Sequence, residues 1–490
     1  MAGVLPAWGV SQLSTNIPLG SSIYSDLDKL DGLGYLDAMQ TGTRPYTRMQ
    51  VAGWLEGIRD KMTEANPPEY AKTILAGLEA EFHDELTALG GAEIPNRLRL
   101  AELTWTNADY DGPTLAQHQT RSTYQPLNIN NDGYRLADDL NSILTFRLEG
   151  NVGEAMVFSA TPHLSYSKST DLSADLEAGY FKTHLRNFQI QLGKEAMWWG
   201  QGQWGSLALT NNSEPFTALK FSNLEPLRLP GWFQYLGPTN TTFFYSKLGD
   251  DRTDVKNPAF VGWRTDFTPA SNFTFAAGIN SFLGGEGHEF GWDDLWDFLT
   301  QKNADSPSQE KWNSIAGFDF RWRLPQFNGL QIYGEYYGED QAGFLPSRHA
   351  LLLGTYLPRL TADGRWDLQL ETSRTSRYWY NHWLYKDGYV NEGDIIGDAM
   401  GHNAERYDLQ LNHYLANGNR LAFHGAYVAM DRAAVYPQEV RLGWISYTAK
   451  LTSSCSLEAT AGLADIDNLD YQAGRSDRNH LFSIKLNYDL

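Results

Sequence analysis

Apolar and polar residues alternate one by one along most of the chain after about residue 97. In the last eleven residues, one side of the alternation is apolar, with Phe482, Ile484, Leu486, Tyr488 and Leu490. The other side is polar, with Ser483, Lys485, Asn487 and Asp489. Residues 318–324 repeat the pattern, with Phe318 and Phe320 next to Asp319 and Arg321. Side chains alternate between the two faces of a strand, so a period of two predicts β-strands with one apolar face and one polar face.

The charged face of these strands indicates which side meets water. An arginine or lysine turned toward lipid at mid-bilayer costs about 2–4 kcal/mol, so in a membrane barrel the charged face must line the lumen. A large soluble all-β protein rich in sugar-binding aromatic residues is the alternative. The repeated polar faces and the C-terminal strand favour the barrel.

A helical period replaces the alternation near the N-terminus. Apolar residues recur every three or four positions over 21–36, which predicts a first helix. Thr47 is a candidate N-cap for a second helix through about Ala65, and Pro67-Pro68 opens a third through about Leu89. We expect two parts: residues 1–95 as a helical periplasmic module packed against the barrel mouth, and residues 96–490 as the barrel.

The length of the second part sets the strand count. Spanning strands need about 9–11 residues each plus connections, so we expect an all-β transmembrane barrel of about 18 antiparallel strands. An even number returns both chain ends to the periplasm. The long segments 281–313 and 373–403 are then extracellular loops or inward-folded plugs, and 325–329 is a short periplasmic turn.

Composition agrees with this fold class and excludes some partners. Mean hydropathy is −0.45, and no apolar run approaches the ~20 residues of a spanning helix. The 16 Trp and 26 Tyr suit membrane interfaces. A net charge of −20 makes nucleic acid an unsuitable partner. Residues 1–10 lack the features of a secretion signal, so we expect that the signal has been removed or that the start is truncated.

Two motifs carry a resemblance to a known family. The run from Tyr24 through Leu27, Leu30 and Leu33-Gly34, followed by Thr43 to Arg48, resembles the N-terminal helical segment of the Wzi capsule-assembly family. So does the segment from Lys194 through Trp198-Trp199-Gly200 to Asn211-Asn212. Shorter motifs follow in the family's order: Phe282 to Gly287, Asp319 to Arg321, Tyr333 to Glu335 and Gly397 to Gly401. Gln201-Gly202-Gln203 departs from the family, whose members often carry Pro and Arg there, and the third helix looks like an extension.

The resemblance implies a lectin-like protein in the outer membrane of a Gram-negative bacterium. It would hold capsular or extracellular polysaccharide at the cell surface and contact outer-membrane lipid and lipopolysaccharide, with the polysaccharide export machinery as a further candidate partner. The sequence indicates neither a cofactor nor an enzyme. The alternative function is a porin for small solutes, which differs in having an unblocked lumen.

The first candidate carbohydrate site is the segment from Trp198 to Asn212. Trp198, Trp199 and Trp204 offer flat faces to sugar rings, and Asn211 and Asn212 can bond hydroxyls. The same glycine-rich segment can instead be a lumen loop packed by its own tryptophans, which would plug the barrel.

The second candidate site is the run Arg374 to Trp383. Arginines 374 and 377 beside Tyr378, Trp379 and Trp383 suit an acidic sugar, through charge-assisted hydrogen bonds and ring contact. A girdle at the membrane interface uses the same residue types.

Catalytic and metal sites have little support. His163 and Ser165 share a strand face, but alternation turns both inward and no third group is identifiable. Asp465, Asp467 and Asp470 lack the glycine and the terminal glutamate of a calcium loop. We therefore predict neither catalytic residues nor a metal.

Overall fold

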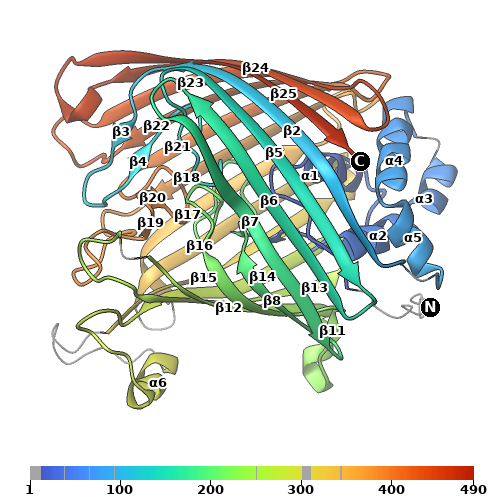
Figure 1. The fold of residues 1–490 in the computed structure, drawn as a ribbon, viewed down its shortest axis with the longest axis horizontal. Coiled ribbons are helices and arrows are strands. Elements are labelled where there is room, and N and C mark those ends of the chain that lie inside the picture. The colour runs from blue at the N-terminus through green and yellow to red at the C-terminus, as the bar shows by residue number, and fades with distance from the viewer. Residues whose placement is uncertain are drawn as a thin grey trace.

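The computed structural model describes residues 13–37, 39–65, 67–92, 94–249, 251–300, 311–342 and 345–490. Within these residues, eighteen antiparallel strands close a barrel (Figure 1). A further two-residue strand, β11 (Leu227–Arg228), pairs with one of them. The predicted fold class and strand number are confirmed. No helix in the described part combines the length and apolarity needed to cross a membrane.

The barrel strands follow the chain order around the wall. They are β2 (Arg97–Asp111), β5 (Asp139–Val152), β6 (Met156–Ser167), β7 (Asp171–Leu185), β8 (Phe188–Lys194), β10 (Thr217–Asn223), β12 (Pro238–Lys247), β13 (Ala259–Ala270), β14 (Phe273–Leu283), β15 (Trp312–Leu324), β16 (Leu330–Ala342), β17 (Leu345–Leu357), β18 (Trp366–Thr375), β21 (Glu405–Tyr414), β22 (Arg420–Met430), β23 (Gln438–Lys450), β24 (Cys455–Asp467) and β25 (Ser476–Asp489). Pairing of β2 with both β5 and β25 closes the cylinder, with Glu102 opposite Asp489 and Asp111 opposite His480 at the seam.

The alternation predicted from sequence places the faces correctly. Phe318 and Trp322 lie exposed on the outer wall, while Asp319 and Arg321 are buried inside. On β25, Phe482 is likewise exposed on the outer wall. The outer wall is therefore apolar and the interior polar, as a membrane barrel requires.

Five helices lie at the end of the barrel where both β2 begins and β25 ends, which we call the helical end (Figure 1). They are α1 (Ile23–Gly32), α2 (Arg48–Glu56), α3 (Ile58–Ala65), α4 (Glu69–Glu81) and α5 (His83–Leu89). The Thr47 hydroxyl accepts a hydrogen bond from the Gln50 amide at 3.1 Å, which confirms the predicted N-cap. The second and third predicted helices are each broken in two, at Gly57 and Phe82, and the first ends before the predicted residue 36. A domain boundary at residues 95–96 stays a prediction.

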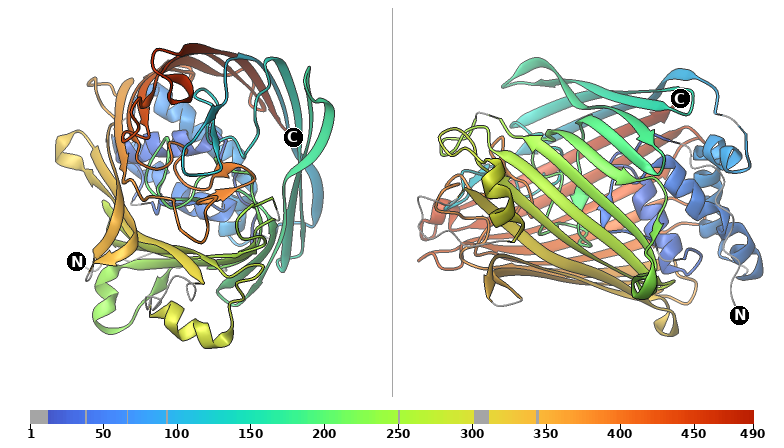
Figure 2. Two further views of the ribbon diagram at one scale, coloured as in Figure 1. Left: turned by 90° about the vertical axis from the view of Figure 1, so that its left-hand side faces the viewer. Right: turned by 90° about the horizontal axis from the view of Figure 1, so that it is seen from below.

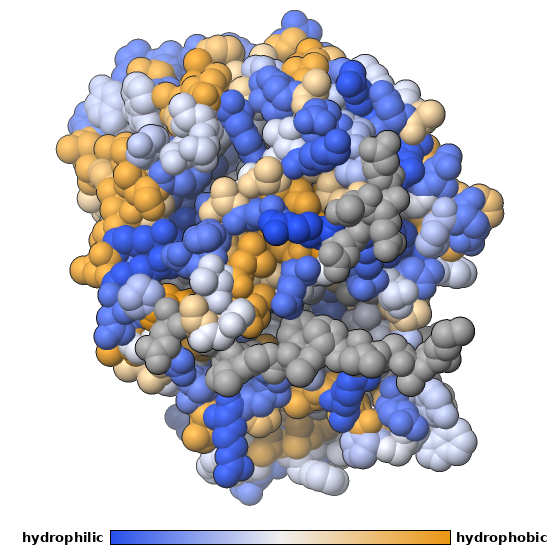
Figure 3. Space-filling view, turned by 90° about the vertical axis from the view of Figure 1, so that its right-hand side faces the viewer, coloured by the Kyte–Doolittle hydropathy of each residue, from blue (hydrophilic) through white to orange (hydrophobic). Residues whose placement is uncertain are grey.

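The helices pack against the barrel rather than standing apart. The Lys29 ammonium on α1 donates to the Pro358 and Gly364 carbonyls at 2.8 Å and pairs with Asp367 at 2.9 Å. Burial lowers the pKa of Lys29, and the charge of Asp367 opposes that shift. A side chain at Gly32 would meet the Pro358 ring at 2.6 Å, so α1 can approach the rim only with glycine there. Figure 3 views this end, where polar and apolar side chains cover the barrel mouth.

The opposite end carries the long connections, and we call it the loop end. In the first of the two long segments singled out above, 281–313, the helix α6 (Trp292–Leu299) has no buried residue. The second, predicted as 373–403, runs between strands from residue 376 to residue 404 and folds into the lumen together with 195–216 (Figure 2, left). We refer to these two connections, 195–216 and 376–404, as the plug.

Adjacent residues on β6 provide a test of the two faces. Leu164 is 40% exposed on the outer wall, whereas Ser165 faces the lumen. Leu164→Arg should destabilise the inserted barrel by about 2 kcal/mol. Ser165→Arg should leave insertion unchanged, because water can solvate the new charge. Heat-modifiable migration of outer-membrane fractions measures the amount of folded, inserted barrel in each variant. Equal loss of inserted barrel in the two variants would contradict this assignment of faces.

Candidate functional site

The first plug segment crosses the lumen and is held at its start by the N-terminal segment. β9 (Trp198–Trp199) pairs antiparallel with β1 (Thr43–Arg44), which lies just before the Thr47 cap. The two family-like motifs of the sequence therefore meet in space. Trp199 is 1% exposed and packs against the Phe244 ring of the wall, at 5.2 Å between centroids.

A buried carboxylate of the wall fixes the glycine-rich turn of this segment. Glu335 on β16 accepts hydrogen bonds from the backbone amides of Gln201 and Leu207, at 2.7 and 2.8 Å. Gly200 has φ +143°, and a side chain there would meet Glu335 at 2.3 Å. Glycine is required because backbone and carboxylate approach this closely. Glu335 is thus occupied in holding the plug.

A second buried cluster surrounds Arg406 on β21. Its guanidinium pairs with Asp398 of the plug and Asp408 at 2.7 Å each, and with Glu371 at 3.2 Å. Glu371 in turn accepts from the Gln203 amide at 2.7 Å. Burial raises the pKa of Asp398, and the charge of Arg406 opposes that shift. Arg406 therefore ties both plug segments to the wall.

Gln201, at the position where the sequence departs from the family, joins three parts of the molecule. Its side-chain amide donates to Asp319 on β15 at 2.7 Å and accepts from the Thr41 hydroxyl at 2.8 Å. Its backbone carbonyl accepts a hydrogen bond from the Arg321 guanidinium at 3.1 Å. Glutamine suits this position because it both donates and accepts.

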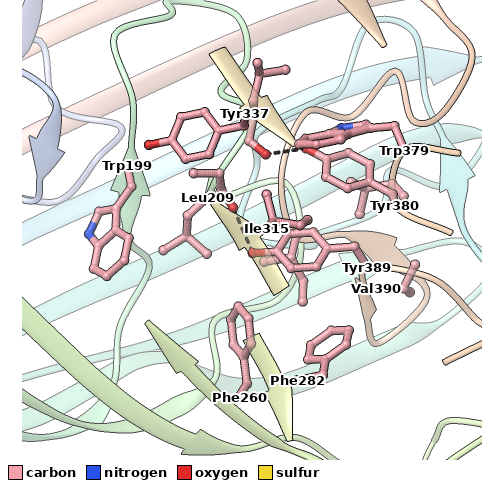
Figure 4. Packing of buried hydrophobic residues seen from close by; sticks show 14 of the residues in the cluster. Trp199, Leu209, Phe260, Phe282, Ile315, Tyr337, Trp379, Tyr380, Tyr389 and Val390 are labelled. Atoms are coloured by element: carbon pink, nitrogen blue, oxygen red, sulfur yellow. Dashed lines mark hydrogen bonds between the residues drawn. The ribbon is translucent and has the colours of Figure 1, made fainter. Parts of the chain in front are cut away.

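The two plug segments also pack directly on each other. Figure 4 shows Trp379, Tyr380 and Tyr389 stacked toward the first segment, within one buried apolar cluster. The Tyr380 hydroxyl donates to the Leu207 carbonyl at 2.7 Å, and the Tyr389 hydroxyl to the Ala208 carbonyl at 2.9 Å. The lumen centre is thus filled by a packed core.

The structure places the first set of predicted sugar-binding residues inside the barrel, and Trp199 belongs to this core. Trp198, Trp199 and Trp204 are all buried. The Asn211 and Asn212 amides donate to the Asn130 and Ile395 carbonyls, at 2.9 and 3.0 Å. These contacts are those of the plug alternative, and sugar binding by the five residues stays a prediction.

The second set is divided between surfaces. Tyr378 and Trp383 are exposed at the loop end, whereas Trp379 is fully buried in the plug. Arg374 and Arg377 are exposed as well. Arg374 lies next to the last residue of β18 and on its outward face, because burial alternates along that strand and Ser373 and Thr375 point inward. Arg374 and the buried Trp379 therefore do not belong to one cluster.

A polar cavity of about 790 Å³ lies beside the plug, along β2, β5, β6 and β7. Hydroxyl side chains including Ser159, Thr161 and Ser165 line it. Burial, together with the negative charge of Glu177, raises the pKa of Asp132 to about 7 in this cavity. The cavity was not predicted from the sequence, although Ser159, Thr161 and Ser165 share one face of β6.

The acidic run near the C-terminus is held by arginines. Asp465, Asp467 and Asp470 pair with Arg478, Arg441 and Arg475, respectively, at 2.5–2.6 Å. No group of three or more metal-binding side chains occurs among the described residues.

Comparison with known proteins identifies the family. The model of the capsule assembly protein Wzi family matches residues 110–481. The chain belongs to the Wzi family. A Klebsiella pneumoniae protein, described as an uncharacterized 55.8 kDa protein in the cps region, is 30% identical over 171 residues. That match spans 34% of this chain and 34% of the Klebsiella protein.

A solved structure shows the same fold. Escherichia coli Wzi, described as an outer membrane protein involved in group 1 capsule assembly and a carbohydrate-binding β-barrel, superposes with a TM-score of 0.71 at 19% identity. The alignment covers 98% of this chain and 99% of that one. Pseudomonas aeruginosa OpdL is less similar, with a TM-score of 0.45, 12% identity, and coverage of 80% and 98%. This Wzi family member is an outer-membrane β-barrel.

Proposed function

We propose that this protein binds a capsular or extracellular polysaccharide at the outer membrane and takes part in its attachment or assembly. The observation that carries the proposal is the filled lumen in a member of the Wzi family. Buried side chains of the two plug segments occupy the barrel centre, so the barrel is built to present a surface rather than a pore.

The orientation follows from the connections. Short turns and the helices lie at the helical end, and long connections at the loop end, which is how outer-membrane barrels face the periplasm and the exterior. The exposed rings of Tyr378 and Trp383 at the loop end then face outward, where a glycan can stack on them. We propose these two as its aromatic contacts.

Solute passage is the second candidate function, and the polar cavity beside the plug is the observation in its favour. The two functions differ in measurable ways. For a binding protein, a deletion strain should release polysaccharide into the medium, and the purified protein should show little single-channel conductance. Stable channels, together with unchanged polysaccharide retention, would reverse the assignment.

The aromatic contacts can be tested in a strain that retains its polysaccharide. Tyr378→Ala combined with Trp383→Ala should weaken binding roughly tenfold, the equivalent of about 1.4 kcal/mol. Trp232→Ala is the matched control, because Trp232 is 85% exposed but lies at the other end of the barrel. Surface polysaccharide per inserted protein is the measurement. An equal effect of the control would remove these residues from the site.

A further inference from the structure

An apolar groove of about 630 Å³ crosses the outer wall over β17, β18, β21 and β22. Leu353, Leu370 and Leu409 line it, and each is between 39% and 48% exposed. The groove continues the apolar wall that lies in the bilayer, so its natural contents are hydrocarbon chains. Side chains on neighbouring strands bound it.

The floor of the groove is Gly425 on β22. A side chain at this position would meet nothing closer than the Leu442 carbonyl, at 3.9 Å. Neither a tight contact nor a positive φ requires glycine here. The missing side chain therefore leaves open space between Leu409 and its neighbours, and a larger residue could fill it without disturbing the wall.

Positive charge lies at the loop end of this groove. Thr372 lines the groove, and Arg374 follows it on the same outward face, about 7 Å farther along β18. Neither Arg374 nor Arg377 has an ion pair with a described residue. The residue opposite Arg374 on β21 is Glu405, which pairs instead with Arg432 at 3.6 Å.

Tyrosine rings mark the level at which the groove leaves the bilayer. Tyr407 and Tyr427 line the part of the groove nearer the loop end, and their stacked rings are 6.4 Å apart between centroids. Tyrosine favours the boundary between hydrocarbon and head groups. Arg374 lies beyond Tyr407 toward the loop end, because Thr372 is the residue opposite Tyr407. Arg374 is thus at head-group height.

We propose that this groove and Arg374 bind one molecule of outer-leaflet lipopolysaccharide, with an acyl chain in the groove and a lipid A phosphate on Arg374. Guanidinium groups bind phosphate through paired, charge-assisted hydrogen bonds. The loop end faces the outer leaflet in the proposed orientation, so the site rests on that part of the proposed function. Polysaccharide binding itself is not required.

The experiment measures lipid bound to the purified, folded barrel in detergent by native mass spectrometry. The probes are lipid A and phosphatidylglycerol of matched chain length. Wild-type protein should retain lipid A at least fivefold better than phosphatidylglycerol. Gly425→Leu should reduce binding of lipid A at least fivefold by filling the groove, and Arg374→Gln should reduce it equally and remove its dependence on salt.

Arg478→Gln is the matched control, because Arg478 is an exposed arginine near the loop end that pairs with Asp465 at 2.6 Å. It should bind lipid A as the wild type does, and heat-modifiable migration checks that every variant is folded. Unchanged lipid A binding in Gly425→Leu and in Arg374→Gln would overturn the proposal, as would equal retention of phosphatidylglycerol by the wild type. Unchanged polysaccharide retention in a deletion strain, with intact lipid A binding by the purified protein, would count against the proposed function alone.

Discussion

Replacing Arg406 with methionine is expected to lower the free energy of unfolding by about 3–5 kcal/mol. The change leaves Glu371, Asp398 and Asp408 buried around an apolar side chain, with no cation to balance them. Removing one partner of a buried ion cluster costs far more than the cluster contributes when intact, because the remaining charges stay out of water. Urea titration of the purified barrel, followed by tryptophan fluorescence, measures the loss.

Arg441→Met is the control for this experiment. Arg441 also pairs with two carboxylates, Asp467 at 2.5 Å and Glu439 at 3.1 Å, but its side chain is 57% exposed. Exposed pairs contribute at most about 1 kcal/mol. If the two variants lost similar amounts of unfolding free energy, burial would not be the reason that the Arg406 cluster contributes to stability.

Replacing Lys29 with methionine should detach α1 from the barrel. The buried Asp367 would lose its ammonium partner, again at a cost of about 3–5 kcal/mol. The Pro358 carbonyl would lose its bond from Lys29, and the Gly364 carbonyl would keep only the bond from the Tyr70 hydroxyl at 2.9 Å. Amide hydrogen exchange over residues 23–32 should rise strongly while exchange in the strands stays slow.

Lys61→Met serves as the matched change in the same group of helices. Lys61 pairs with Asp37 at 2.7 Å, and both side chains are exposed. Amide hydrogen exchange in the Lys61→Met variant should resemble that of the wild type. If Lys29→Met left exchange in α1 unchanged, the helix would be held by its apolar contacts and not by the ion pair.

The alternation in the sequence was sufficient to predict the barrel and its faces. Period-two patterning follows from the strand geometry itself, so Asp319 and Arg321 could be placed inside without knowing any partner. The cap at Thr47 was predictable for a similar reason, since only local atoms take part. Breaks at Gly57 and Phe82 were not predicted, because they depend on how the helices pack against one another.

The plug could be predicted only as one of two alternatives. Its glycines and tryptophans indicated a tight, packed segment, but its partners Glu335 and Glu371 lie more than a hundred residues away in the chain. Pairing over such distances leaves no signal in a single sequence. The outward direction of the Arg374 side chain could have been predicted by counting in twos from Leu370. It was not, because the aromatic residues that follow led to Arg374 being grouped with them.

The pairing of β1 with β9 connects the helical end of the barrel with the loop end. Thr43 and Arg44 belong to the segment that links the helices α1 and α2, whereas Trp198 and Trp199 begin the plug on which the loop-end segment rests. A continuous path of hydrogen bonds and packed rings therefore runs from the helices to the loop end, through the lumen and not through the wall. Force applied to the helices reaches the loops at the other end even if no strand of the barrel bends.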